Sequence, residues 1–323
     1  MQLSFQVEDI ARSLIQAFNE TLQNNSWIGN TTREALEKVL KVPLEIGYPD
    51  ALLNMSVLEA FYKYVPYFPS NISFTEAFYY FQENLYKMKL RKFRHPEESN
   101  WRSVHSPRER RSTFHEKYGI DIEIPYPIFV SPFFQRGLPR SLNYGGIGGT
   151  IARELGSTFS IDGIKPILGH SKFEEFKKLA ASRTSCFEQE YGAVNKKTLQ
   201  ELDRSATLRM PGAGTDQDIA DNTGLQTAFK AYSRVLEDEC ANVDTRLSGL
   251  ENITGVQLFF ISSARAQCKI TDKNWLTKEI SSWDITPARN RVNEAMKNLE
   301  AFAKAFKCSL GSHMYSNKTC SWL

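Results

Sequence analysis

A glycine-rich stretch runs directly into a helix-forming segment between Asn143 and Ser157, and this junction constrains the fold more than any other part of the chain. In the H-E-x-x-H helix of zinc peptidases, two histidines one turn apart bind the metal and the glutamate activates a bound water. Here Arg153 and Ser157 stand at the histidine positions, and only Glu154 matches. Arginine stays protonated and offers no lone pair, and a serine hydroxyl is a poor zinc ligand.

The pattern R-E-x-x-S means little alone, because a glutamate on an amphipathic helix is usually a solvated side chain. A second segment strengthens the interpretation. Apolar residues recur at helical spacing from Asp218 through Leu236, which predicts a second helix. Gln217 and Asp221 lie at its start.

Four motifs occur in one order along the chain: LNYGGIG at 142–148, IADNTGL at 219–225, QLFF at 257–260, and the stretch from Thr286-Pro287 to Arg291. Together they resemble the C-terminal half of the neprilysin and endothelin-converting-enzyme family of zinc metalloendopeptidases. The similarity runs from about residue 7 to the C-terminus. It is that of a divergent, catalytically inactive member, of the kind found in insects or other invertebrates.

The resemblance implies a mostly α fold (α+β), with a zincin, thermolysin-like domain and a small edge sheet over residues 111–323. Residues 1–110 would form a helical segment that corresponds to the end of the family's N-terminal region. Residues 121–130 alternate in polarity and predict a strand, which Pro125 and Pro127 would confine to the edge of the sheet next to the cleft.

The resemblance also assigns the metal positions. The family's third zinc ligand is a glutamate, and Gln217 stands in its place, so Arg153, Ser157 and Gln217 replace all three protein ligands. Zinc is the family's cofactor, but we expect none here, because disturbing even a partner of a ligand typically costs about 10- to 100-fold in affinity. Glu154 is retained and is expected to be idle without a metal-bound water.

The family's substrate contacts are partly kept. Asp221, which in the family orients the first histidine, is present, and so is Arg291, which helps to hold the substrate backbone. Ile285 stands where the oxyanion-stabilising histidine would be, and it cannot donate a hydrogen bond. The anchoring N-A-Y/F-Y segment reads Ser112-Thr113-Phe114-His115, so its asparagine is lost.

The vacated position suggests a new contact. If Arg153 points where the histidine would point, its guanidinium lies within reach of Asp221 and Glu154, and we predict a bidentate ion pair between Arg153 and Asp221. The alternative is that Arg153 extends along the surface into solvent.

Composition limits the classes of partner. The chain has 323 residues, 41% of them hydrophobic, so it can bury one large core or two unequal ones. A net charge of +3 is too small to indicate nucleic-acid binding. No apolar run approaches the roughly 20 residues that a membrane-spanning helix needs. The N-terminus does not read as a signal peptide, because Glu8, Asp9 and Arg12 interrupt the segment that should be apolar.

Glycosylation signals indicate a secreted glycoprotein. N-x-S/T sequons favour an extracellular or secretory-pathway location, or a membrane-anchored protein if an N-terminal part precedes this chain. The alternative is that they are coincidental asparagines on a polar surface. The seven sequons begin at Asn19, Asn24, Asn30, Asn54, Asn71, Asn252 and Asn317.

Five cysteines cannot pair completely within one chain. By resemblance, Cys186 and Cys320 form a disulfide bond, whereas Cys268 and Cys308 pair with cysteines of an N-terminal half. Cys240 has no counterpart in the family. Five reduced thiols in a cytosolic protein are the alternative.

The rest of the chain reads as helices and one linker. A 3.6-residue apolar period over Val7–Leu22 predicts an amphipathic helix, and Thr31 or Thr32 could cap the next helix, at 33–42 before Pro43. Helices are also predicted at 256–266 and 292–306. The ring-rich stretch 61–86 is predicted to be core, either within this chain or at an interface with an N-terminal half. Residues 87–111 carry nine basic and three acidic side chains and predict a solvated linker at the domain boundary.

Three functions are open on this evidence. The first is a pseudopeptidase that binds a peptide or protein through the old cleft, using Arg291 and the edge strand. The second is the family activity, a zinc metalloendopeptidase that cleaves extracellular peptides. The third is a structural partner that assembles with an N-terminal half. The five histidines argue against the second function, because none lies at ligand spacing from Glu154.

Overall fold

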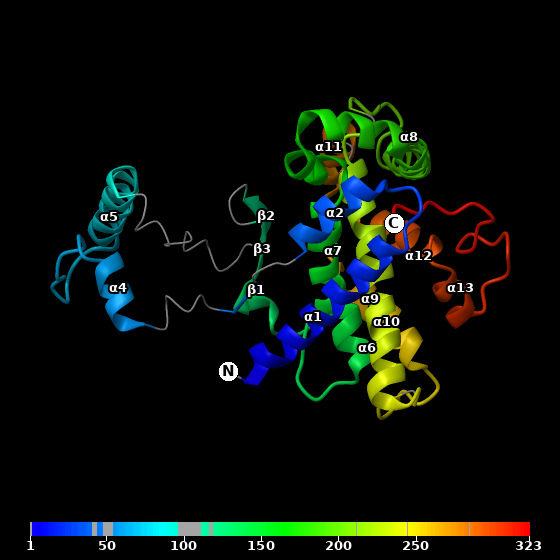
Figure 1. Ribbon diagram of the computed structural model, residues 1–323, viewed down its shortest axis with the longest axis horizontal. Helices are drawn as coiled ribbons and strands as arrows, with labels where there is room; N and C mark the ends of the chain where they lie inside the picture. Colours follow the sequence, from blue (N-terminus) through cyan, green and yellow to red (C-terminus); the bar gives the residue numbers. More distant parts are fainter. Residues whose placement is uncertain are drawn as a thin grey trace.

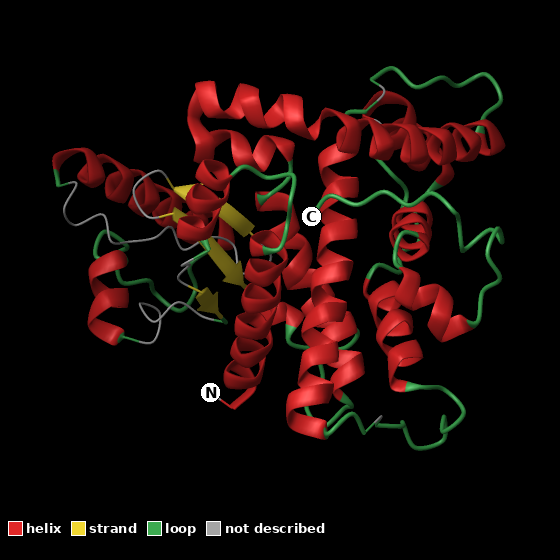
Figure 2. Cartoon of the chain, turned by 45° about the vertical axis from the view of Figure 1, so that its right-hand side comes forward, coloured by secondary structure: helices red, strands yellow, loops and turns green. Residues whose placement is uncertain are grey.

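The computed structural model describes residues 2–40, 44–47, 54–95, 111–115, 119–210, 212–243, 245–283 and 285–323. The chain is mostly helical with one small sheet, and the predicted fold class is confirmed (Figures 1 and 2). The strands are β1 (Leu44–Ile46), β2 (Arg111–His115) and β3 (Gly119–Ile124). The helices are α1 (Gln2–Gln23), α2 (Asn30–Val39), α4 (Met55–Phe61), α5 (Phe74–Arg94), α6 (Arg140–Asn143), α7 (Gly149–Thr158), α8 (Ile161–Leu202), α9 (Thr215–Cys240), α10 (Gly255–Ala266), α11 (Lys273–Trp283), α12 (Ala288–Lys297) and α13 (Glu300–Phe306).

The apolar stripe of α1 packs into the central core, as its period predicts. Val7, Leu14 and Phe18 are buried, and the ring of Phe18 lies 4.6 Å from that of Phe159 at the end of α7. On its polar side, α1 contacts α9, where Lys230 Nζ lies 3.0 Å from Thr21 Oγ1. Helix α1 is therefore part of the same core as the C-terminal helices. The predicted division at residue 110 falls among residues 96–110, which lie outside the described residues.

The sheet corrects one prediction. Its strand order is β1-β3-β2, with β1 parallel and β2 antiparallel to β3. The predicted strand over 121–130 is shorter, and it is central rather than at the edge. Pro125 and Pro127 did not confine it, because the strand ends at Ile124 and both prolines belong to the following 3-10 turn, where no ladder N–H is lost.

Helix boundaries differ from expectation in two places. Helix α2 begins at Asn30, with Gly29 rather than a threonine at its N-cap position, so the predicted threonine cap is wrong. Residues 292–306 form two helices, α12 and α13, instead of one. The break follows Asn298, the C-cap of α12, and Leu299 has extended backbone angles. The Asn298 side chain donates to Glu190 Oε2 and Asn222 Oδ1 and accepts from the backbone N–H of Cys320.

Helices α7 and α9 cross at very close range. An added Cβ on Gly224 of α9 would lie 2.7 Å from the backbone N and Cα of Arg153. An added Cβ on Gly156 of α7 would lie 2.8 Å from the carbonyl oxygen of Ala220. Glycine at both positions therefore allows the two backbones to touch, and this contact fixes the spacing of the side chains on either side of it.

Helices α4 and α5 stand apart from the main helical body, on the far side of the sheet (Figure 1). The rings of α5 and of the segment before it are largely exposed, so they are not core within this chain: Tyr67 is 104% exposed, Phe74 83% and Tyr79 62%. That they are core at an interface with an N-terminal half stays a prediction. The first part of the predicted linker is also corrected, because residues 87–94 continue α5.

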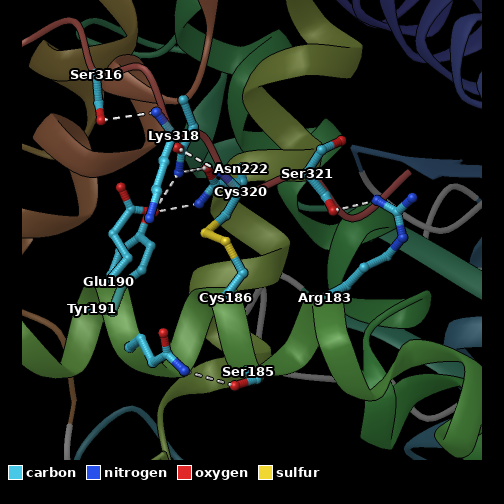
Figure 3. Close-up of a disulfide and its surroundings, with 12 residues drawn as sticks. Arg183, Ser185, Cys186, Glu190, Tyr191, Asn222, Ser316, Lys318, Cys320 and Ser321 are labelled. Atoms are coloured by element: carbon cyan, nitrogen blue, oxygen red, sulfur yellow. Dashed lines mark hydrogen bonds between the residues drawn. A yellow bond between two sulfur atoms is a disulfide. The ribbon is translucent and has the colours of Figure 1, made fainter. Parts of the chain in front are cut away.

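A disulfide bond and a hydrogen bond link the C-terminal tail to α8. The predicted disulfide between Cys186 and Cys320 is present, with a Cα–Cα distance of 5.7 Å (Figure 3). Arg183 Nη1 donates to the carbonyl oxygen of Ser321 at 2.8 Å. The buried Trp322 donates from its indole nitrogen to the carbonyl oxygen of Phe159 at 2.8 Å, which ties the tail to the end of α7.

Candidate functional site

Three helices bring their charged side chains together around one buried carboxylate. Asp221 of α9 has a side chain that is 1% exposed. Arg153 Nε of α7 donates to Asp221 Oδ1 at 2.8 Å. Arg291 of α12 donates from Nε to Oδ2 at 2.5 Å and from Nη2 to Oδ1 at 2.7 Å. Asp221 therefore lies between two guanidinium groups.

The predicted ion pair between Arg153 and Asp221 is confirmed, but its geometry differs. Arg153 makes a single bond to Asp221, and its Nη1 lies 3.3 Å from Glu154 Oε1. The bidentate partner of Asp221 is Arg291 instead. Burial lowers the pKa of the Arg291 guanidinium, but the hydrogen bond and charge of Asp221 outweigh burial and raise it. Arg291 thus stays charged in the folded protein.

The contact between Arg291 and Asp221 was missed by sequence reasoning. The resemblance assigns Arg291 to the substrate and Asp221 to a metal-binding histidine, so it predicts no contact between the two residues. Their separation of 70 residues carries no local pattern. One feature of the sequence points to such a contact: Asp221 keeps its carboxylate although Arg153 stands where the histidine that it would orient is expected. A buried carboxylate at this position needs basic partners.

The other predicted site residues differ in their surroundings. Ser157 is exposed and Gln217 is half-buried in the first turn of α9. Ile285 is half-buried, and its backbone N–H donates to the carbonyl oxygen of Glu279. Ser112 and Thr113 lie in β2, opposite Ile122 and Asp121 of β3, but their side chains lie outside the described residues. Their predicted roles stay predictions.

A cavity of about 230 Å³ opens beside the two arginines. Its floor is the glycine-rich stretch that precedes α7, including Gly146 and Gly149. Leu225 and Met296 provide apolar wall, and the segment after α10 adds Cys268 and Lys269. The glycine-rich stretch is held close to the loop before it, since Ile147 N–H donates to the carbonyl oxygen of Phe133 at 2.7 Å. That stretch forms a π-helical turn, a feature that is frequent at functional sites.

The residues at the vacated positions do not fit a zinc ion. Zinc prefers histidine nitrogen, cysteine sulfur and carboxylate oxygen, whereas this site presents guanidinium, hydroxyl and amide groups. Both oxygens of Asp221 already accept hydrogen bonds from arginines. Within the described ranges, no three His, Cys, Asp or Glu side chains gather closely enough to hold a metal ion.

A profile described as peptidase family M13 matches residues 113–322. The chain belongs to peptidase family M13. The M13 assignment confirms the predicted neprilysin and endothelin-converting-enzyme family, since the chain is 30% identical over 325 residues to neprilysin-1 of Caenorhabditis elegans. It is also 29% identical over 329 residues to membrane metallo-endopeptidase-like 1 of Mus musculus, and 27% over 323 residues to endothelin-converting enzyme 1 of Rattus norvegicus.

Each of these alignments covers 97% of the M13 chain but only 40 to 41% of the relative. The chain thus spans about two fifths of the length of the curated relatives it matches. Solved structures agree on the fold. The Haemonchus galactose containing glycoprotein complex matches with a TM-score of 0.74 and 21% identity over 100% of this chain and 50% of the other. The zinc metalloprotease ZMP1 of Mycobacterium tuberculosis, in complex with an inhibitor, matches with a TM-score of 0.70 and 18% identity over 99% and 47%.

Among the residues that the structure describes, no helix combines the length and apolar character needed to cross a membrane. Six of the seven sequon asparagines are exposed, namely Asn24, Asn30, Asn54, Asn71, Asn252 and Asn317, while Asn19 is half-buried.

Proposed function

We propose that this chain is a pseudopeptidase of the M13 family that binds a peptide or a protein through the cavity beside Arg153 and Arg291. The single observation that carries the proposal is the state of Asp221, which is pinned by two arginines in a site whose three ligand positions hold no zinc ligand. Proteins that share a fold can differ in activity, so family membership alone does not assign an activity.

Energetics support the loss of hydrolysis. Structural zinc sites bind with roughly 10 to 16 kcal/mol at neutral pH, and that energy comes from direct bonds to deprotonated ligands. A fixed guanidinium at position 153 would instead repel a divalent cation, by Coulomb's law, at short range. Without a metal to lower the pKa of a water, Glu154 has no activated nucleophile to generate.

The sheet offers a way to hold an extended ligand. Strand β2 ends the sheet order, and in the described part of the chain it pairs on one side only, with β3. An extended peptide can add to such a strand by backbone hydrogen bonds while its side chains enter neighbouring pockets. Because β2 rather than the predicted strand lies at the edge, the proposed peptide-binding edge moves to Arg111–His115.

Zinc content and turnover test the loss of activity. We expect purified protein to contain well under one zinc per chain by mass spectrometry, and to cleave a mixture of extracellular peptides no faster with zinc than with a chelator. Stoichiometric zinc with chelator-sensitive cleavage would establish the alternative, the metalloendopeptidase activity of the family.

Selection from a displayed peptide library tests binding. The Val292→Trp variant places a large ring at the cavity wall, and we expect it to lose the peptides that the parent protein enriches. Leu310→Trp, at a side chain that is 63% exposed and outside the cavity, is the matched control and should keep them. Equal enrichment by both variants would argue against the cavity as the binding site.

A second candidate function is assembly with an N-terminal half supplied by another chain. Two observations favour it: the exposed rings of α4 and α5, and the unpaired thiols of Cys268 and Cys308. Large exposed apolar patches mark protein interfaces. Disulfide-linked partners recovered from secreted material without reductant, and lost from Cys268→Ser, would support this role, while a monomer with free thiols would oppose it.

The proposed location is the extracellular space or the secretory pathway. The exposed sequons support it, because asparagine-linked glycans need accessible acceptors. Protein expressed with a secretion signal should lose mass on treatment with a glycosidase that removes asparagine-linked glycans. No change in mass would oppose the secretory assignment.

A further inference from the structure

The cavity beside Arg153 is unusual in the chemistry of its wall. Its charged lining residues are Arg153, Arg291, Lys269 and Asp221, three basic groups and one acid. The carboxylates of Glu154 and Asp218 lie close to the arginines but do not line the cavity. The surface that a ligand would meet is therefore basic.

The two guanidiniums retain donors for a ligand. A guanidinium has five N–H groups in a planar fork that matches a carboxylate. Arg153 uses two of its nitrogens, for Asp221 and Glu154, and Arg291 uses two, both for Asp221. The side chains of Arg153 and Arg291 are 25% and 17% exposed, so their remaining N–H groups can be reached from the cavity.

A second observation points to a neutral donor on the same ligand. Gln267 lines the cavity, and its Oε1 atom is buried without a hydrogen-bond partner among the described residues. A buried acceptor that is left unsatisfied has lost its hydrogen bonds to water without a replacement, which is unfavourable. A ligand N–H placed in the cavity would remove that cost, so the lining of one cavity matches a ligand that carries both a carboxylate and an N–H.

We propose that the cavity captures the C-terminal residue of a peptide. In a C-terminal residue the α-carboxylate and the backbone N–H are attached to one Cα. This pair matches the basic side chains and the unpaired Gln267 Oε1 that line the cavity. The apolar side chains of Leu225, Val292 and Met296 fit an apolar last residue. A volume of about 230 Å³ is below the roughly 300 to 1,000 Å³ of sites for drug-sized ligands, so it suits one or two residues.

The inference rests on the proposed peptide-binding function and narrows its ligand. An acidic side chain within a peptide has the same carboxylate chemistry, so the test separates the two sources. The probes are acetyl-alanyl-leucine as the free acid, the same dipeptide as its C-terminal amide, and acetyl-alanyl-glutamyl-alanine amide. Binding is measured by ligand-observed NMR titration.

We expect the free acid to bind at least about tenfold more tightly than either amide, the factor that about 1.4 kcal/mol of charge-assisted hydrogen bonding provides. The preference should shrink with added salt, because screening weakens exposed charges. Arg153→Gln and the exposed Lys269→Ala should each reduce the preference, while Gln267→Leu should weaken the acid and the amide alike. Arg140→Gln, at an exposed ion pair with Glu239, should change nothing.

Other outcomes overturn the inference. If the acid and its amide bind equally, or if the preference persists in Arg153→Gln, the carboxylate is not recognised here. Tightest binding of the glutamyl peptide would assign the site to acidic side chains instead. Should these probes fail while library peptides still depend on the cavity, only the C-terminal capture falls; failure of both experiments removes the proposed function as well.

Discussion

At the scale of single residues, Asp221 balances the charge of the site. Its carboxylate is almost fully buried and accepts hydrogen bonds from Arg153 and Arg291, which come from different helices. A buried ion pair owes its stability to both partners, since each one offsets the cost of removing the other from water. The same contacts that leave Asp221 unable to serve a metal therefore help to hold α7, α9 and α12 together.

Replacing this carboxylate should be costly. We expect Asp221→Asn to lower the free energy of unfolding by about 3 kcal/mol, the low end for breaking a buried pair, because Arg153 remains a quarter exposed. Urea unfolding followed by circular dichroism measures the loss. Glu239→Gln breaks the exposed pair with Arg140 and should cost less than about 1 kcal/mol. Equal losses would show that Asp221 has no special role in stability.

A second carboxylate predicts a dependence on pH. Burial raises the pKa of Glu190 above its ordinary value of 4.5, although the hydrogen bond from Asn298 and the charge of Lys297 oppose the rise. The folded protein thus holds this proton at higher pH than the unfolded chain does. Its contribution to stability is complete below pH 4.5 and is lost as the pH rises through the folded pKa.

Removal of this group should therefore change the pH profile. We expect the stability of Glu190→Gln, relative to the parent protein, to increase as the pH is raised from about 4 to about 7, because the variant carries no buried charge. Urea midpoints across that range measure the difference between the two proteins. A constant difference at every pH would contradict the assignment.

The ion pair of Arg153 could be predicted from sequence, and that of Arg291 could not. The motif frame places position 153 opposite position 221 on two facing helices, so a basic and an acidic residue there must meet. The arginine at position 291 reaches the same carboxylate from a third helix, whose orientation depends on tertiary packing. Such a contact has no signature in local spacing.

At the scale of elements, the crossing of α7 and α9 decides the shape of the site. Gly156 and Gly224 let the backbones touch, and the backbone of Arg153 lies at the point of contact. A methyl group there would meet main-chain atoms, which cannot rotate out of the way. The separation of the two helices is therefore set by the backbone.

Gly224→Ala should force the helices apart. The new Cβ would lie 2.7 Å from backbone atoms of Arg153, so we expect a loss of about 3 kcal/mol or more in stability and a weaker Arg153 to Asp221 contact. Gly192→Ala on α8 is the control, since an added Cβ there meets nothing within 4 Å. It should be neutral or stabilising by up to about 1 kcal/mol. Thermal unfolding of both variants is the measurement.

Periodic helices were predictable, and the short strands were only partly so. The stripe of α1 and the start of α7 follow from spacing, because one face of each must be covered by apolar neighbours. Strand β1 has three residues, too few to show alternation. The break between α12 and α13 depends on the buried hydrogen bonds of Asn298, which link segments far apart in sequence.

At the scale of the whole molecule, one covalent bond closes most of the C-terminal part. Cys186 and Cys320 are 134 residues apart, and a loop of that length contributes about 4 to 5 kcal/mol in the chain-entropy account. We expect Cys186→Ala to lose stability of that order in chemical denaturation. Cys240→Ala, at a free and half-buried cysteine, should cost less than about 1 kcal/mol. A small loss in the first variant would show that noncovalent packing of the tail suffices.

The exposed face of α4 and α5 could not be placed from sequence. Rings at helical spacing normally predict burial, and the sequence contains nothing that says which polypeptide would cover them.

The backbone contact at Gly156 and Gly224 has a consequence for protein engineering. When the spacing of two helices is set by contact between their backbones, the side chains around the contact can be substituted without changing that spacing. Histidine at positions 153 and 157 and glutamate at position 217 would be presented by helices whose spacing is set by contact between their backbones. The chain is thus a starting point for asking how few substitutions build a zinc site on these helices.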